Sequence, residues 1–242
     1  MGRKPKRQRD PARSHGRAQA VVQVTREPCH GSVETQGSGW ISAKLSVTVL
    51  QELLKCLEET RLTGPAFTPF SKSGEQATHL PGRQRALHGS TLWRKWQPGV
   101  EAALADLSGL TCPQCHACLG SHELVAADLN VMRPGAALWP HTDVYETLGK
   151  GRFVVVLLLL QPAATGGQFR VALEAGHAEV AWRAVDGAST LARRDRDTVL
   201  VPLFAPGDGC VVDGGQMVHE VGRVWGTTPR VSVPITLRCR CS

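Results

Sequence analysis

The chain has 242 residues and a formal net charge of +7, from 28 lysines and arginines and 21 acidic residues. Seven of the basic residues and one acid lie within residues 1–17, which leaves 21 basic and 20 acidic residues elsewhere. The folded part is therefore nearly neutral, and the positive charge indicates a basic segment rather than a basic domain. The longest apolar run, Phe153–Leu160, has eight residues, which is too short for a membrane-spanning helix and typical of a buried strand.

Residues 1–19 are rich in Arg, Lys, Pro, Gln and Ser, a composition that predicts a disordered basic tail. Residues 3–7 are typical of a nuclear-localisation signal or a loose nucleic-acid contact, and also of a solvated terminus without a partner. An organellar transit peptide would also be Arg-rich, but it would show an apolar stripe that this segment lacks. No secretory signal begins the chain, so we expect an intracellular protein, nuclear or cytoplasmic, with its cysteines reduced.

We expect residues 20–121 to form a supporting region of helices and loops, with a short strand near residues 20–25. Leucines at positions 50, 53, 54 and 57 share one helical face and predict a helix over Ser46–Thr60. Residues 61–90 lack any periodicity and predict a long loop. A second apolar face predicts a helix over Ser90–Leu107, whose second half Pro98 should begin or kink. Helices ahead of a β region commonly support one of its sheets.

Residues 122–242 form the predicted β core. From Leu124 the sequence changes to short apolar runs separated by Gly and Pro, which favours a sandwich or a jelly-roll-like barrel. Such an arrangement brings the ends of strands that are distant in sequence together at one mouth. The expected strands lie near residues 124–132, 136–141, 152–160, 167–173, 177–184, 197–203, 209–213, 218–225 and 230–239.

A dense group of soft metal ligands precedes this core. Cys112, Cys115, Cys118 and His122 could supply four zinc ligands from one short loop. Their spacing is not one of the usual zinc patterns, and cysteine at a helix end often serves as a small buried hydrophobic residue. Structural zinc, unliganded or redox-active thiols and a small iron–sulfur site all remain open interpretations. Cys239 and Cys241 share one strand face and can reach a neighbour, although nothing in the sequence requires it.

His141 and Asp143 form an H-x-D pair, and His219 follows much later in the chain. Two imidazoles and one carboxylate on one face of a metal form the facial triad of non-haem Fe(II) oxygenases. That arrangement leaves three coordination positions open, enough for a chelating cosubstrate and O2. The sequence therefore predicts a metal site formed by these three residues.

Arg230 and Ser232 follow the distal histidine in an R-x-S pattern. A guanidinium offers a planar fork that fits a carboxylate bidentately. Residues two apart on a strand face the same side, so the Ser232 hydroxyl can add a hydrogen bond to the same carboxylate. The pair therefore predicts an anchor for the distal carboxylate of a small dicarboxylate near the metal.

This order of motifs resembles the 2-oxoglutarate/Fe(II)-dependent dioxygenase superfamily. Leu129–Gly135 looks like the strand and turn that precede H-x-D in this superfamily. Gly166–Phe169 and Pro206–Asp213 resemble segments of its prolyl-4-hydroxylase-like branch. The resemblance covers roughly residues 122–239 and implies a mostly β fold with N-terminal helices and a double-stranded β-helix core. Met132 stands where many relatives carry a tyrosine that contacts 2-oxoglutarate, which puts that one contact in doubt.

The resemblance implies Fe(II) bound by the triad, 2-oxoglutarate anchored by Arg230 and Ser232, O2 as oxidant, and ascorbate as a reductant that keeps the iron reduced. It implies hydroxylation of a C–H bond, and the prolyl-hydroxylase-like motifs favour a protein or peptide side chain as substrate. Asn130 and Tyr145 are expected to line the pocket. The sequence leaves the oligomeric state open, and it indicates no membrane partner.

Three alternatives stay open from the sequence. The basic tail and the R-x-S pattern also suit a nucleic-acid base dioxygenase, but the alkylated-base demethylases carry a second arginine where Thr236 stands here. No stacking array or basic groove is visible in the core sequence. A non-catalytic, metal-binding β-barrel module and a small-molecule oxygenase of secondary metabolism complete the set.

Overall fold

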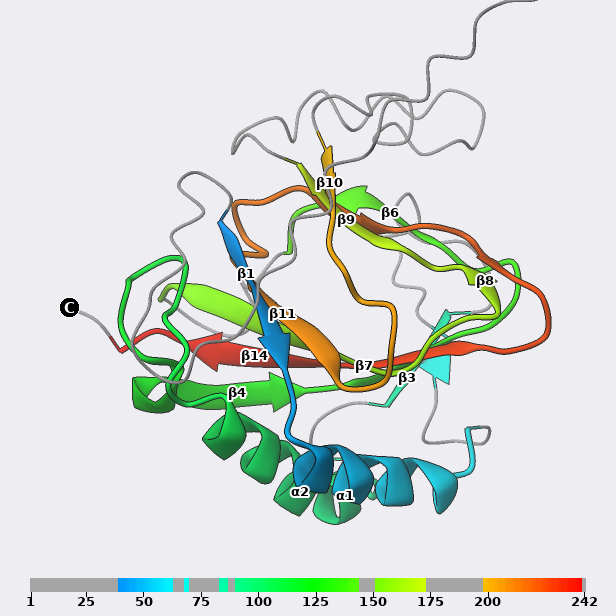
Figure 1. The fold of residues 1–242 in the computed structure, drawn as a ribbon, viewed down its shortest axis with the longest axis horizontal. Helices are drawn as coiled ribbons and strands as arrows, with labels where there is room; N and C mark the ends of the chain where they lie inside the picture. The colour runs from blue at the N-terminus through cyan, green and yellow to red at the C-terminus, as the bar shows by residue number, and fades with distance from the viewer. Residues whose placement is uncertain are drawn as a thin grey trace, which may run out of the picture. The chain divides into compact units, whose positions relative to one another are not determined.

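The structure, a computed structural model, describes six stretches of the chain: residues 39–62, 68–69, 83–86, 90–143, 151–172 and 198–240. All of them belong to one unit, Ser32–Ser242 (Figure 1). The predicted basic tail and the strands expected near residues 20–25 and 177–184 lie outside these stretches. None of the helices in the described stretches is long and apolar enough to cross a membrane.

Most strands of the described stretches belong to one large antiparallel sheet. Its strand order is β1-β11-β7-β14-β5-β3-β2, and β4 also pairs with β14. The bounds are β1 Trp40–Lys44, β2 Thr68–Pro69, β3 Arg83–Ala86, β4 Glu123–Ala127, β5 Leu129–Met132, β7 Phe153–Gln161, β11 Asp208–Val212 and β14 Arg230–Arg238.

A smaller sheet lies across from the large one, with the order β10-β9-β12-β6, and β13 pairs with β8 in a separate ribbon (Figure 1). The bounds are β6 Leu138–His141, β8 Thr165–Gly166, β9 Phe169–Ala172, β10 Thr198–Leu200, β12 His219–Val221 and β13 Val224–Trp225. Two sheets of this kind form the expected sandwich, so the predicted β class is confirmed.

Strand β7 separates two hydrophobic cores. Val154, Val156 and Leu158 pack into a cluster with residues of both helices, whereas Val155 and Leu157 pack with residues of the small sheet. Successive side chains of a strand point to opposite faces, so a continuous apolar run serves both cores at once. This explains why the longest apolar run of the sequence is a strand between two layers.

Helices α1 (Val47–Glu58) and α2 (Trp93–Asp106) cover one face of the large sheet, as expected (Figure 1). Leu53 and Val100 are fully buried beneath them. Helix α2 continues through Pro98, so this residue neither begins nor ends the helix. Both helices lie within three residues of their predicted bounds, because their apolar stripes alone specify which face is buried.

The region before residue 122 contributes more than helices. Strand β1 pairs with β11. Strand β3, which lies inside the stretch expected to be a loop, pairs with β5. The loop prediction for residues 61–90 is therefore wrong at β2 and β3. Polar strands such as Arg83–Ala86 lack an apolar alternation, and only pairing with a neighbouring edge defines them. The short 3₁₀ helix η1 (Leu119–Ser121) leads into β4.

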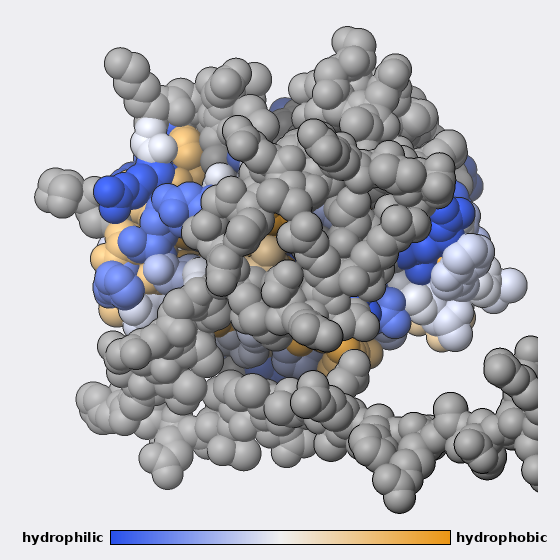
Figure 2. Space-filling view, turned by 90° about the horizontal axis from the view of Figure 1, so that it is seen from above, coloured by the Kyte–Doolittle hydropathy of each residue, from blue (hydrophilic) through white to orange (hydrophobic). Residues whose placement is uncertain are grey.

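Seen from above, the described residues place hydrophilic side chains at both sides of this face, with small hydrophobic groups between them (Figure 2). The large hydrophobic side chains with high exposure come from separate parts of the chain: Val47, Leu200, Phe204 and Trp225. Isolated exposed hydrophobic residues are ordinary at a protein surface, so these four do not indicate a binding partner.

Candidate metal centre

The three predicted metal ligands meet at the small sheet. His141 ends β6, His219 begins β12, and the two residues lie opposite each other in this antiparallel pair. Asp143 follows β6 by two residues, and the ligand atoms of all three side chains lie within 4.8 Å of one another. The Nε2 atoms of His141 and His219 lie 3.6 and 3.7 Å from Asp143 Oδ1.

Backbone contacts orient these side chains. His219 Nδ1 lies 2.9 Å from the Met217 carbonyl oxygen, which can only accept, so Nδ1 carries the proton and donates. In a neutral imidazole Nε2 then keeps its lone pair toward Asp143, as a metal ligand requires. The Asp143 amide donates to the Gly214 carbonyl at 2.7 Å, which ties the loop after β6 to the turn after β11.

Arg230 begins β14 and is almost completely buried, with 2% of its surface exposed. Its Nη1 donates to Ser232 Oγ at 2.8 Å, while its Nη2 has no hydrogen-bond partner among the described residues. Burial lowers the pKa of this guanidinium to about 10. A buried cation with an unused donor is costly unless an anion pairs with it. The arrangement therefore favours an anionic ligand at Arg230.

Asn130 lies opposite Ser232 in the pairing of β5 with β14, so both are close to the arginine. Its side chain is buried, and its Oδ1 has no hydrogen-bond partner in the described stretches. Met132 lies opposite Arg230 in the same pairing and is also buried. Tyr145, the other residue expected to line the pocket, lies outside the described residues.

The Gly166-Gly167 turn explains how Arg230 fits. Gly166 and Gly167 have φ values of 76° and 67°, a region that disfavours side chains. A Cβ at Gly167 would lie 3.0 Å from Arg230 Cδ, and one at Gly166 would lie 2.0 Å from the Arg223 carbonyl oxygen. Phe169, two residues after the turn, packs against His219 with ring centroids 5.7 Å apart. The segment Gly167–Phe169 therefore runs close to Arg230 at one end and packs against a predicted metal ligand at the other.

Sequence reasoning found this turn by its resemblance but missed that it lies close to Arg230. It also missed the carbonyl groups of Met217 and Gly214 that hold His219 and Asp143. Backbone atoms carry no residue-specific signal, so no pattern in the sequence could have identified these two partners.

The structure brings together three of the four side chains that the sequence suggested as zinc ligands, and replaces the fourth. Cys112, Cys115 and His122 come together, but the fourth member of the group is Cys239, which directly follows β14. Cys118 is exposed and does not belong to the group. Thr111 and Cys118 form an isolated antiparallel β-bridge across the loop.

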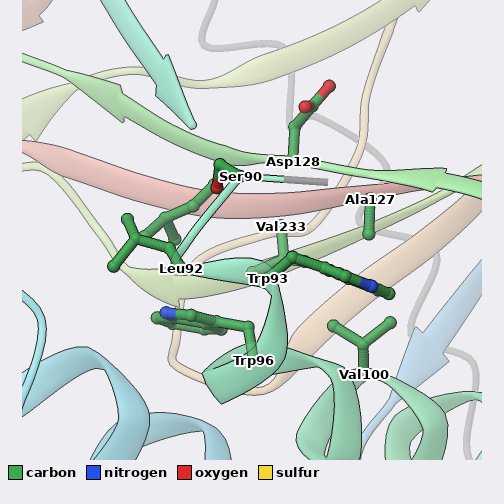
Figure 3. A pocket seen from close by; sticks show the side chains of 9 residues that line it. Ser90, Leu92, Trp93, Trp96, Val100, Ala127, Asp128 and Val233 are labelled. Carbon is green, nitrogen blue, oxygen red and sulfur yellow. The ribbon is translucent and has the colours of Figure 1, made fainter. Parts of the chain in front are cut away.

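A separate hollow lies between α2 and the large sheet. Trp93, Trp96 and Val100 project from α2 toward strands that carry Ala127 and Val233 (Figure 3). Its volume of about 20 Å³ accommodates roughly one water molecule. None of the triad residues lines this hollow, so it is a packing feature and not a candidate active site.

No protein-family profile and no curated protein sequence matches this chain. Several solved structures do match it in fold. A prolyl-4-hydroxylase from Pseudomonas putida matches with 19% identity over 84% of this chain and 94% of its own, with a TM-score of 0.50. A prolyl hydroxylase from Trichoplax adhaerens, in complex with a hypoxia inducible factor oxygen degradation domain peptide fragment, matches with 14% identity over 83% of this chain and 84% of its own, with a TM-score of 0.51.

SnoK, a non-haem alpha-ketoglutarate-dependent carbocyclase from nogalamycin biosynthesis, matches with 14% identity over 84% of this chain and 80% of its own, with a TM-score of 0.56. At these identities the similarity concerns the fold. The chain therefore has the double-stranded β-helix fold of the 2-oxoglutarate/Fe(II)-dependent oxygenases, with prolyl hydroxylases among its structural neighbours.

Proposed function

We propose that this protein is an Fe(II)- and 2-oxoglutarate-dependent dioxygenase that hydroxylates a C–H bond. The observation that carries the proposal is the combination of the converging triad with a buried arginine that has an unused donor. Each feature alone has ordinary structural explanations. A Cβ at Gly167 would lie 3.0 Å from Arg230 Cδ, and Phe169, two residues later, packs against His219, which supports placing the two features in one site.

The donor set fits Fe(II). His141 and His219 would supply two imidazole nitrogens and Asp143 one carboxylate oxygen, a set that suits a divalent iron with open positions. The hydrogen bond from His219 Nδ1 to Met217 would keep its Nε2 free to ligate. Bound iron, together with 2-oxoglutarate, would supply the activation of O2.

The arginine fits the distal carboxylate of 2-oxoglutarate. Arg230 would donate through Nη2, and Ser232, already in contact with Nη1, would add its hydroxyl. Because both side chains are buried, this ion pair would form away from water, where charged hydrogen bonds are strong. Asn130 Oδ1 is a nearby acceptor that a bound ligand or an ordered water could satisfy.

The other residues of the site would orient the ligands and exclude water. Phe169, Val171 and Met132 belong to the apolar core between the two sheets, and Phe169 packs against His219. Apolar surroundings of this kind suit a reaction whose oxidant must reach one C–H bond and no stray water.

For the substrate, we propose a protein or peptide side chain. The likeness to two prolyl hydroxylases, one with a bound peptide fragment, supports this class. The likeness to SnoK, whose TM-score of 0.56 is higher than those of the two prolyl hydroxylases, supports a small-molecule substrate as the second candidate. The near-neutral core and Thr236, which stands in place of a second arginine, argue against nucleic-acid bases.

The first experiment is an anaerobic titration of the purified protein with Fe(II) and 2-oxoglutarate. We expect a weak visible charge-transfer absorption that disappears in His219→Ala and weakens in Arg230→Ala. His116→Asn serves as the control, because it removes an exposed histidine outside the triad and asparagine tolerates the left-handed φ of 59° at this position.

Absence of the band in folded, iron-supplied protein would contradict the proposal and favour a non-catalytic metal-binding module. If the band forms, succinate release in air is then measured with ascorbate present, against a peptide pool and against small-molecule extracts. Release stimulated by peptides and not by small molecules supports the peptide class. The reverse result would replace it with the small-molecule class.

A further inference from the structure

A second cluster of metal-ligating side chains lies where two distant segments meet. Cys112, Cys115 and His122 come from the loop between α2 and β4, and Cys239 follows β14, 127 residues after Cys112. Their sulfur and nitrogen ligand atoms all lie within 4.8 Å of one another. None of them belongs to the triad at the small sheet.

The distances within this cluster match a tetrahedral ion. Cys112 Sγ and Cys239 Sγ lie 3.8 Å apart, and Cys115 Sγ and His122 Nε2 lie 3.4 Å apart. Zinc with bonds of about 2.3 Å to sulfur and about 2.0 Å to nitrogen places such pairs roughly 3.8 and 3.5 Å apart at tetrahedral angles.

A hydrogen-bond chain fixes the imidazole in the form that ligates through Nε2. Ser121 Oγ donates its single proton to the Cys118 carbonyl at 2.7 Å. Its contact with His122 Nδ1 at 3.1 Å must therefore be one in which Nδ1–H donates to the hydroxyl oxygen. In a neutral imidazole the lone pair of Nε2 then faces Cys115 Sγ, inside the cluster. A second hydrogen bond of this kind accompanies most metal-bound histidines.

The loop is also shaped around the cysteines. The Cys112 amide donates to the Ala117 carbonyl at 2.8 Å, and the His116 amide donates to the Cys112 carbonyl at 2.9 Å. His116 has a left-handed φ of 59°, the one non-glycine residue of the described stretches with positive φ. Such a conformation persists only where the surroundings enforce it.

From these observations we infer that Cys112, Cys115, His122 and Cys239 bind a structural zinc ion. Three thiolates and one imidazole in tetrahedral arrangement select zinc over harder divalent metals. All four positions are filled by protein, which leaves none for a substrate. The ion crosslinks the loop after α2 to the end of β14, the strand that begins with Arg230. This inference is independent of the proposed enzymatic function.

The test must separate this ion from metal bound at the triad. Asp143→Ala is therefore introduced first to remove a triad ligand, and zinc is measured in the full chain by elemental analysis. We expect about one zinc per chain in this background, and a loss of at least roughly tenfold when Cys239→Ser or Cys112→Ser is added. Cys118→Ser and His116→Asn, on the same loop, should retain the zinc.

A measurement on the intact cluster covers the case in which the cysteine variants fail to fold. Cobalt(II) is exchanged into Asp143→Ala protein, and its absorption spectrum is recorded. Sulfur-to-cobalt charge-transfer bands together with the intense d–d bands of tetrahedral cobalt support the site. Folded Asp143→Ala protein that binds neither zinc nor cobalt would overturn the inference. Loss of zinc in Cys118→Ser together with its retention in Cys239→Ser would equally reject this ligand set.

Discussion

His219 lies directly opposite His141 in the antiparallel pairing of β12 with β6, and their ring centroids are 4.3 Å apart at an interplanar angle of 53°. The register of this pair shifts between His219 and Val221, which marks an irregularity directly after the ligand. Bulges of this kind re-aim side chains near active sites. The pairing of two short strands therefore brings both imidazoles to Asp143.

Replacing Asp143 with alanine should abolish metal-dependent turnover. The carboxylate is the only anionic ligand of the triad, and even outer-shell changes at metal sites cost about 10- to 100-fold in affinity or activity. We expect succinate formation to fall by more than about 100-fold, with the chain still folded. Glu101→Ala, at an exposed position on α2, is the matched control. Undiminished iron-dependent succinate formation in Asp143→Ala would rule out this ligand assignment.

Replacing Arg230 with methionine should separate ligand binding from stability. Methionine keeps much of the side-chain volume but removes a buried charge, so the ligand-free protein should unfold at an equal or higher temperature. The affinity for 2-oxoglutarate should fall roughly 10- to 100-fold, the loss expected for hydrogen bonds to charged groups. Thermal unfolding with Mn(II), with and without 2-oxoglutarate, measures both effects.

The control for this experiment is Arg223→Met, which changes an exposed arginine that stacks on Trp225, with its guanidinium carbon 5.3 Å from the ring centroid. It should keep the stabilisation that 2-oxoglutarate produces. Equal stabilisation of Arg230→Met and the parent protein by 2-oxoglutarate would refute the role assigned to Arg230.

A methyl group at Gly167 should disturb the arginine. Gly167→Ala places a Cβ 3.0 Å from Arg230 Cδ at a φ of +67°, whereas Gly135→Ala meets nothing within 4 Å at a φ of +90°. Both variants should lose about 1–2 kcal/mol of stability from the left-handed backbone alone. Only Gly167→Ala should also raise the KM for 2-oxoglutarate. The same rise in both variants would show that the effect comes from strain and not from the contact.

The pH dependence of stability should reveal Asp213. Burial is the largest influence and raises the pKa of its carboxyl, while hydrogen bonds from the Gln216 amide and the Gln114 side chain partly oppose this. Its contribution therefore favours folding below the unfolded pKa and is lost as the pH rises through the higher folded pKa. Asp213→Asn removes that loss, so the variant should gain stability relative to the parent as the pH rises above about 4, the ordinary pKa of an aspartate.

Denaturant unfolding of both proteins at several pH values measures this difference. Glu101→Gln, which removes one exposed carboxylate from α2, provides the comparison and should follow the parent more closely. Parallel stability curves for Asp213→Asn and the parent across these pH values would contradict the prediction.

Much of the site could be predicted because its parts are local in sequence. The H-x-D pair places two ligands two residues apart, and Arg230 and Ser232 share one face of a strand. Their order along the chain also carries the resemblance to the oxygenase superfamily. The helices were predicted within a few residues because an apolar stripe defines both their extent and their buried face.

Other features depend on pairing between segments that are far apart. Strand β1 lies at one edge of the large sheet because it pairs with β11, and β3 joins the sheet through its pairing with β5. Such strands are short or polar, so their own residues hardly favour an extended conformation. Hydrogen bonds to strands far away in the sequence therefore hold these segments in the extended conformation.

The sequence by itself determined the fold class, the two buried helices, the three side chains that converge and the Arg230–Ser232 pair, because apolar periodicity and the order of motifs can be read along the chain. Only the tertiary structure decided which cysteine completes the second cluster. Cys239 lies 127 residues from Cys112, but the two thiols meet because β14 ends beside the loop after α2. Cys118 lies only six residues from Cys112, yet it is exposed, outside the cluster, and pairs with Thr111 in an isolated β-bridge. Distance along the chain is a poor guide once strand pairing sets distance in space.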